Sequence, residues 1–143
     1  FVAEQVQLDD IQGLRKEGFA SVIDMRPDGE AADQPDSTSV GRLVQRQHMN
    51  FSYIPVPHGD IPDDVVRKLQ NALATSPKPV LLYCRSGRRA VRTWSLLEAS
   101  RPSGLSAQQI LATARASGQT VDDLGEVIAQ RIAKRNAATT SKP

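Results

Sequence analysis

The sequence predicts an α/β fold with a four-stranded, mostly parallel sheet flanked by helices. Short apolar, β-branched segments alternate with segments whose apolar residues recur at helical spacing, which is the pattern of parallel strands joined by crossover helices. Residues 80–83 are continuously apolar, as is typical of a strand buried inside a parallel sheet. The length of 143 residues favours one domain. We therefore expect a single domain over residues 1–135 and a flexible tail over residues 136–143.

Several segments have the character of strands. The second one is rich in apolar and β-branched residues and ends at a turn formed by residues 26–29, which read Arg-Pro-Asp-Gly. The third ends among the prolines at positions 55 and 57, and the fourth leads directly into the single cysteine of the chain. The expected strands span residues 2–6, 19–25, 51–56 and 80–83.

The segments between these strands predict helices. Asp9 is the expected N-cap of the first helix, Pro62 suits the first turn of another, and Ser106 is expected to cap a helix that Gly118 ends. The expected helices lie between Leu8 and Gly18, over residues 37–47, between Pro62 and Pro77, after Arg89, over residues 107–117, and from Asp122 or Asp123 to Ile132.

The composition excludes several classes of protein. One cysteine cannot form an internal disulfide, and one cysteine with two histidines is too few for a standard structural zinc site. No apolar run approaches the roughly 20 residues of a membrane span. Aromatic residues make up only 4% of the chain, so base-stacking platforms for nucleic acid are not expected. We expect no cofactor, no metal and no nucleic-acid partner.

The charge of the chain is local rather than global. The net charge is only +2, yet Arg85, Arg88, Arg89 and Arg92 lie close together with no acidic residue until Glu98. Such a concentration of positive charge on one short stretch indicates a site for a small anion.

In parallel sheets, functional sites lie beyond the carboxyl ends of the strands. Three predicted loops lie there: residues 24–30, 57–60 and 84–89. The last of them, which we call the Cys84 loop, reads Cys-Arg-Ser-Gly-Arg-Arg and enters a predicted helix. A loop entering a helix points several backbone N–H groups inward, and the helix N-terminus adds about half a positive charge. This field favours a thiolate at Cys84, and Gly87 permits a positive φ or a close backbone approach.

The Cys84 loop resembles the active-site loop of rhodanese-like sulfurtransferases, whose pattern is Cys-Arg-x-Gly-x-Arg. It also resembles the loop of protein tyrosine phosphatases, which has one residue more between its cysteine and its arginine. Here Ala90 stands where the phosphatase arginine would lie, and Tyr83 stands where phosphatases usually have a histidine.

More of the chain resembles a family of small bacterial phosphatase-like proteins called beta-lactamase-hydrolase-like, also found fused to metallo-β-lactamase-fold hydrolases. The resemblance covers about residues 4–132 and is carried by residues 18–30, 53–59 and 84–89 and by a helix with Ile110, Leu111 and Ala114. It implies a protein-tyrosine-phosphatase-like fold. Members of this family have been called both phosphatases and sulfurtransferases.

Both chemistries need a thiolate and an anion cradle, and the short loop leads us to expect sulfur transfer first. In this hypothesis Cys84 carries sulfane sulfur as a persulfide, taken from a small anionic donor and passed to a thiol acceptor. Backbone N–H groups of residues 85–89 form the cradle, Arg89 is the main anion ligand and Arg85 a charge at its rim. Ser86 and Gly87 contribute a hydroxyl donor and a permissive backbone.

The alternative is a cysteine-dependent phosphatase of the tyrosine or dual-specificity type. It forms a phosphocysteine from a phosphorylated substrate and needs an acid to protonate the leaving oxygen, a role that Asp60 could take. Asp60, Asp63 and Asp64 could equally cap or precede the next helix. A second alternative is a non-catalytic module that binds an anion or senses it.

The other candidate substrate-binding residues are Arg26, His58 and Arg88. Arg26 follows the second strand and could bind an anion or pair with Asp24 or Glu30, while His58 could donate a hydrogen bond or a proton. The oligomeric state is open. The chain begins at Phe1, so we expect a trimmed N-terminus, and both the cytoplasm and the periplasm are compatible with the sequence.

Overall fold

The structure is a computed structural model that describes residues 1–140. The chain forms two compact units, Phe1–Ala90 and Val91–Pro143. The first unit contains the sheet and all three of the loops that the sequence places at its carboxyl edge. The expectation of a single domain over residues 1–135 stays a prediction.

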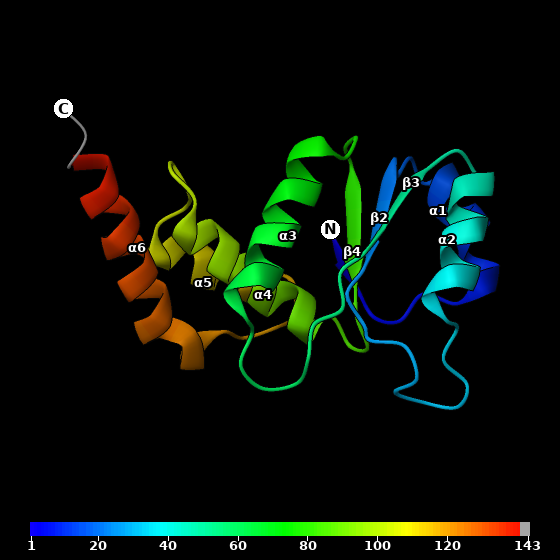
Figure 1. Ribbon diagram of the computed structural model, residues 1–143, viewed down its shortest axis with the longest axis horizontal. Helices are drawn as coiled ribbons and strands as arrows, with labels where there is room; N and C mark the ends of the chain where they lie inside the picture. The colour runs from blue at the N-terminus through cyan, green and yellow to red at the C-terminus, as the bar shows by residue number, and fades with distance from the viewer. Residues whose placement is uncertain (141–143) are drawn as a thin grey trace. The chain divides into compact units, whose positions relative to one another are not determined.

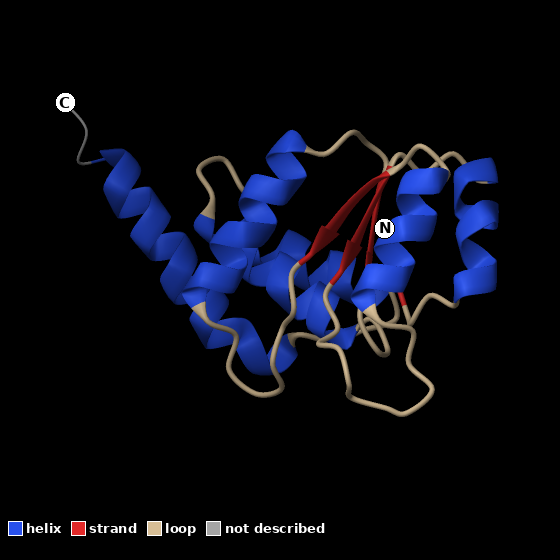
Figure 2. Ribbon diagram, turned by 45° about the vertical axis from the view of Figure 1, so that its right-hand side comes forward, coloured by secondary structure: helices blue, strands red, loops and turns tan. Residues whose placement is uncertain are grey.

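The first unit is built on a four-stranded sheet. Its strands are β1 (Val2–Ala3), β2 (Ser21–Asp24), β3 (Asn50–Tyr53) and β4 (Val80–Tyr83), in the spatial order β1-β4-β2-β3. Every pairing is parallel, so the arrowheads point to the same end of the sheet (Figure 2). The predicted four-stranded, mostly parallel sheet is confirmed.

The register of the three long strands aligns their last residues. Asp24 of β2 lies level with Tyr53 of β3 and with Tyr83 of β4. Both β2 and β4 are buried along their whole length, as expected for the inner strands of a sheet covered on two faces. The chain therefore delivers Asp24 and Cys84 to the same edge from two adjacent buried strands.

Helices cover both faces of this sheet (Figure 1). Helix α1 (Ile11–Lys16), which follows a 3-10 turn, and α2 (Ser37–Arg46) lie on one face, and α3 (Asp63–Thr75) lies on the other. Asp36 caps α2, because its side chain accepts a hydrogen bond from the backbone N–H of Ser39. One hydrophobic core lies between the sheet and helices α1 and α2. Its buried residues are Val6, Ile11, Val22, Val40, Val44, Met49, Leu81 and Tyr83.

The second unit is helical. Helix α4 (Arg88–Ser100) starts in the first unit and continues into the second, where it is followed by α5 (Ala107–Ala116) and α6 (Gly125–Thr140). The Ser106 side chain caps α5 as predicted, by accepting a hydrogen bond from the N–H of Gln109 at 3.2 Å. No helix within residues 1–140 is long and apolar enough to cross a lipid bilayer.

Three details differ from the sequence predictions. The strands are shorter than predicted: Ile54 and Val56 still donate to the carbonyls of Asp24 and Met25, but Pro55 and Pro57 have no N–H to extend a regular ladder. The N-cap of the first helical turn is Gln7, which forms a capping box with Asp10, and not Asp9. Helix α6 runs through Thr140, so residues 136–140 are helical where a tail was expected, consistent with the helix propensity of the alanines in that stretch. Residues 141–143 lie outside the described residues.

The packing of α2 on β3 yields a test of the fold. A Cβ atom at Gly41 would lie 2.8 Å from Cδ2 of Phe51, so Gly41→Ala should destabilise the protein by about 1–3 kcal/mol through overpacking. At Gly13 of α1 a Cβ atom meets nothing within 4 Å, so Gly13→Ala should stabilise by up to about 1 kcal/mol. Urea unfolding of both variants measures the difference, and equal free energies of unfolding would contradict this packing.

Candidate active site

The three predicted loops meet at the carboxyl edge of the sheet through backbone hydrogen bonds. The N–H of Gln5, just after β1, donates to the carbonyl of Arg85 at 3.0 Å. The N–H of Met25 donates to the carbonyl of Tyr83, and the N–H of Val56 donates to the carbonyl of Met25. The segment after each strand is thus attached to its neighbour, so the three loops begin at the same edge of the sheet.

Cys84 lies where β4 ends and its residue is only 1% exposed. The backbone N–H of Gly87 donates to its sulfur at 3.2 Å. Gly87 has φ = 91°, a conformation that residues with a Cβ rarely adopt, so glycine is needed for the loop to turn its amide toward the sulfur. Helix α4 begins with the next residue and directs its positive end to the same place, and both features stabilise negative charge there.

Arg89 is buried at the first turn of α4, and its two terminal nitrogens are engaged by protein groups. Nη1 donates to Glu30 Oε2 at 2.8 Å and to the carbonyl of Val56 at 2.9 Å, and Nη2 donates to Glu30 Oε1 at 2.7 Å. These hydrogen bonds to Glu30 raise the pKa of Arg89, and the nearby Cys84 adds a smaller effect in the same direction. The guanidinium is therefore a fixed positive charge in the site.

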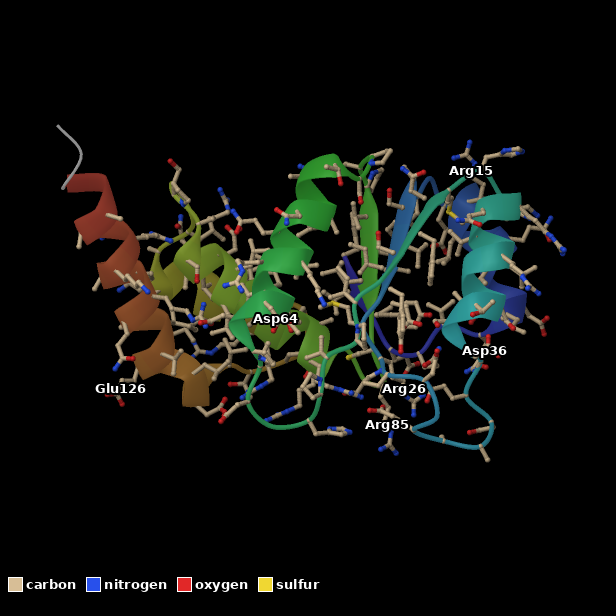
Figure 3. The ribbon with its side chains drawn as sticks, viewed as in Figure 1. Arg15, Arg26, Asp36, Asp64, Arg85 and Glu126 are labelled. Carbon is tan, nitrogen blue, oxygen red and sulfur yellow. The ribbon has the colours of Figure 1, made fainter. Side chains whose placement is uncertain are left out.

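Arg26 is the second buried guanidinium at this edge, and its residue is 5% exposed. Its Nε donates to Glu30 Oε1 at 3.0 Å and its Nη1 donates to the side-chain oxygen of Gln5 at 3.0 Å. The backbone N–H of Gln5 also donates to the carbonyl of Arg85, so Gln5 contacts both Arg26 and the Cys84 loop. Arg26 and Arg85 both lie beyond the ends of the strands (Figure 3). Of the two acidic partners that the sequence offered for the Arg26 side chain, the structure selects Glu30.

Glu30 accepts hydrogen bonds from two arginine side chains, and its pKa is lowered to about 2. The hydrogen bonds from Arg89 are the largest cause, and those from Arg26 act in the same direction. His58 Nε2 lies 3.4 Å from Glu30 Oε2. We call Glu30, Arg26, Arg89 and His58 the Glu30 cluster. The sequence indicated Glu30 only as one partner for Arg26, because nothing in the pattern showed that Arg89 would turn toward it.

The rim of the site consists of exposed side chains. Arg85, Ser86 and Arg88 are exposed, and the Ser86 hydroxyl accepts a hydrogen bond from the N–H of Arg88 at 3.4 Å. The side chain of His58 is 74% exposed. Asp60 is exposed in the turn before α3, whose N-cap is Pro62, so Asp60 does not cap that helix. Asp63 and Asp64 lie in the first turn of α3, as predicted.

Asp24 and Tyr83 form a buried polar pair beside the site that the sequence did not reveal. Asp24 is 1% exposed, and burial raises its pKa from 3.8 to about 6, although the N–H of Arg26 donates to its Oδ1 at 2.9 Å. Burial also raises the pKa of Tyr83. Within the described residues, the Tyr83 hydroxyl makes no hydrogen bond of standard geometry, although Asp24 and Gln5 lie near it.

Among the residues that the structure describes, no three His, Cys, Asp or Glu side chains lie close enough together to hold a metal ion.

Comparison with known proteins places this edge in a phosphatase-like fold. Residues 1–101 match the family described as beta-lactamase hydrolase-like protein, phosphatase-like domain. Beta-lactamase hydrolase-like proteins of Agrobacterium fabrum and Xylella fastidiosa are 34% identical over 98 residues and 30% identical over 97 residues. Each alignment covers 68% of this chain, and the chain spans only 22–23% of the length of these relatives.

Solved structures agree on the fold. A candidate phosphatase from Neisseria meningitidis superposes with a TM-score of 0.80 at 25% identity, covering 91% of both chains. The core catalytic domain of a PP-IP phosphatase from S. cerevisiae gives a TM-score of 0.65 at 15% identity, covering 95% of this chain and 86% of that one. The protein-tyrosine-phosphatase-like fold implied by the sequence is confirmed, and none of the proteins named here is described as a sulfurtransferase.

The raised pKa of Asp24 predicts a specific dependence of stability on pH. An acid whose folded pKa lies above its unfolded value loses stability as pH rises between the two, here from 3.8 to about 6, and the shift corresponds to about 2–3 kcal/mol. Asp24→Asn retains the oxygen that accepts from Arg26 and cannot ionise. Its free energy of unfolding should lack this decrease, and the variant should be more stable than the parent above pH 6. A parallel decrease in both proteins would contradict the assignment to Asp24.

Proposed function

The chain belongs to the family of phosphatase-like domains of beta-lactamase hydrolase-like proteins, and from this premise we propose that it is a cysteine-dependent phosphatase. The observation that carries the proposal is the hydrogen bond of 3.2 Å from the Gly87 N–H to the Cys84 sulfur at the start of α4. A nucleophile under an inward-pointing amide and a helix N-terminus is suited to attack a phosphorus atom whose oxygens those same donors stabilise.

The proposed reaction has two steps at Cys84. The thiolate attacks phosphorus, an S–P bond forms, and the P–O bond to the leaving alcohol breaks while Asp60 gives its proton to the leaving oxygen. Water then attacks the phosphocysteine, the S–P bond breaks, and the water proton goes to the Asp60 carboxylate. The products are the alcohol and inorganic phosphate, and the thiolate and the acid are restored.

The other candidate residues are assigned different roles according to where they lie in the site. The sequence suggested Arg89 as the main anion ligand, but its terminal nitrogens are used by Glu30 and Val56, so we assign it a fixed charge beside the phosphate. Backbone N–H groups of residues 85–89 bind the equatorial oxygens. Arg85, Ser86 and Arg88 are exposed at the rim, where a phosphorylated substrate with further acidic groups would meet them.

Sulfur transfer remains a second candidate because of one observation, the length of the Cys84 loop. Ala90 occupies the position of the phosphatase arginine, and the neighbouring Arg89 binds Glu30 with both of its terminal nitrogens. In this reaction the thiolate attacks a sulfane sulfur, an S–S bond forms at Cys84, and the donor leaves as its anion. An acceptor thiolate then takes the outer sulfur.

Hydrolysis of an aryl phosphate tests the main proposal. Cys84→Ser should reduce kcat by about 10³-fold or more, because the hydroxyl is a far weaker nucleophile than a thiolate. Asp60→Asn should reduce kcat by about 10²-fold, and the loss should shrink for substrates whose alcohol leaves without protonation. Asp64→Asn is the matched control on an exposed side chain of the same segment and should match the parent. Turnover independent of Cys84 would refute the proposal.

Intact mass separates the two candidate functions. A phosphatase should trap phosphate on Cys84 when the aryl phosphate is mixed with the Asp60→Asn variant and quenched in acid. Incubation of the parent with thiosulfate should leave its mass unchanged. Gain of one sulfur atom by the parent, absent from Cys84→Ser, would replace the phosphatase proposal by sulfur transfer.

A further inference from the structure

The Glu30 cluster joins all three loops of the site through one carboxylate. Glu30 ends the turn after β2, and it receives both terminal nitrogens of Arg89 from the start of α4, at 2.8 and 2.7 Å. It also receives the Nε of Arg26 at 3.0 Å, and the ring of His58 lies 3.4 Å away. His58 belongs to the loop that carries Asp60, so the three segments that the topology brings to one edge have this side chain in common.

Because the two arginine side chains are buried, they need a neighbouring negative charge, and the contacts with Glu30 supply it. The side chains of Arg26 and Arg89 are only 7% and 9% exposed, and that of Glu30 is 18% exposed. A buried guanidinium cannot lose its proton, so it must have an anion or carbonyl oxygens around it. The carboxylate that faces both side chains is Glu30, while Asp24 is bound to the backbone N–H of Arg26. Without Glu30, two positive charges would be left side by side with little solvent.

The same contacts fix where Arg89 can point. The Val56 carbonyl and the Glu30 carboxylate hold its terminal nitrogens from two different loops. Arg89 follows two residues after Gly87, whose N–H donates to the Cys84 sulfur at 3.2 Å, so its backbone belongs to the turn that surrounds the nucleophile. The pKa of Arg89 is raised mainly by Glu30 and to a smaller extent by Cys84. Arg89 is thus held in one position, at the turn that follows the nucleophile, by a carboxylate from another loop.

We propose that Glu30 is the positioning residue of the site: it holds the Arg89 charge beside Cys84 and attaches the His58 loop to the Cys84 loop. The inference rests on the proposed function, because it assigns Glu30 a part in the reaction of Cys84. Glu30 acts through Arg89 and not as a proton donor, since its carboxylate is fully engaged and stays ionised through the neutral range.

A double-mutant cycle on Glu30 and Arg89 tests this role, with two readouts. The first is the rate at which iodoacetamide alkylates Cys84 at pH 6, which requires no turnover. The second is kcat/KM for an aryl phosphate. Glu30→Ala and Arg89→Ala should each slow both by about tenfold, and the double variant should be no slower than Arg89→Ala alone, because the two side chains act as one unit. Glu17→Gln, on an exposed glutamate, is the control and should match the parent.

The outcomes are distinct. Faster alkylation in Glu30→Ala would show that Glu30 acts only as a nearby negative charge. Additive effects in the double variant would show that it does not act through Arg89. Either result overturns the inference.

If Glu30→Ala does not fold, Glu30→Asp takes its place, because it retains the charge on a shorter side chain. This variant should show the same slowing to a smaller extent, and rates equal to those of the parent would count against the role. If no protein hydrolyses the aryl phosphate, the proposed function fails, while the alkylation cycle still decides the part played by Glu30.

Discussion

Two guanidinium groups lie almost without solvent at the carboxyl end of the sheet, and the arrangement of the site depends on how their charges are neutralised. An isolated buried charge costs several kcal/mol, on the order of the whole stability margin of a small domain. Both guanidinium groups donate hydrogen bonds to Glu30. Arg89 also donates to the carbonyl of Val56, and Arg26 also donates to the side chain of Gln5. One ionic cluster thereby orders loops that are far apart in sequence and brings a positive field to the single cysteine.

The architecture could be predicted from the sequence because each of its determinants is local. The continuously apolar run at 80–83 and the apolar, β-branched run at 19–25 predicted the two strands that lie inside the sheet. The glycine at 87 and the cysteine before it indicated a turn into a helix, and the structure has Gly87 at positive φ with its amide on the sulfur. Such patterns depend only on residues that are close in sequence, so they can be interpreted without knowledge of the tertiary fold.

The direction of long side chains could not be predicted, because it depends on partners that the fold brings together. Arg89 was expected to face a bound anion, but it turns to Glu30, which lies 59 residues away in the chain. Asp24 was expected at the end of a strand and as one possible partner for Arg26, yet the fold buries it, level with Tyr53 and Tyr83 on the neighbouring strands. The Glu30 cluster and the Asp24–Tyr83 pair both form because the order of strands in the sheet brings their residues together. No short sequence motif determines that order.

The two-residue strand β1 has a consequence for how this domain can be varied or engineered. It adds little area to the sheet, but the residue two positions after it, Gln5, bonds to the carbonyl of Arg85 and to the side chain of Arg26. The segment that follows β1 therefore helps to hold the Cys84 loop, which begins about eighty positions later in the sequence. A substitution or fusion that displaces Gln5 should therefore also shift Arg26 and the Cys84 loop.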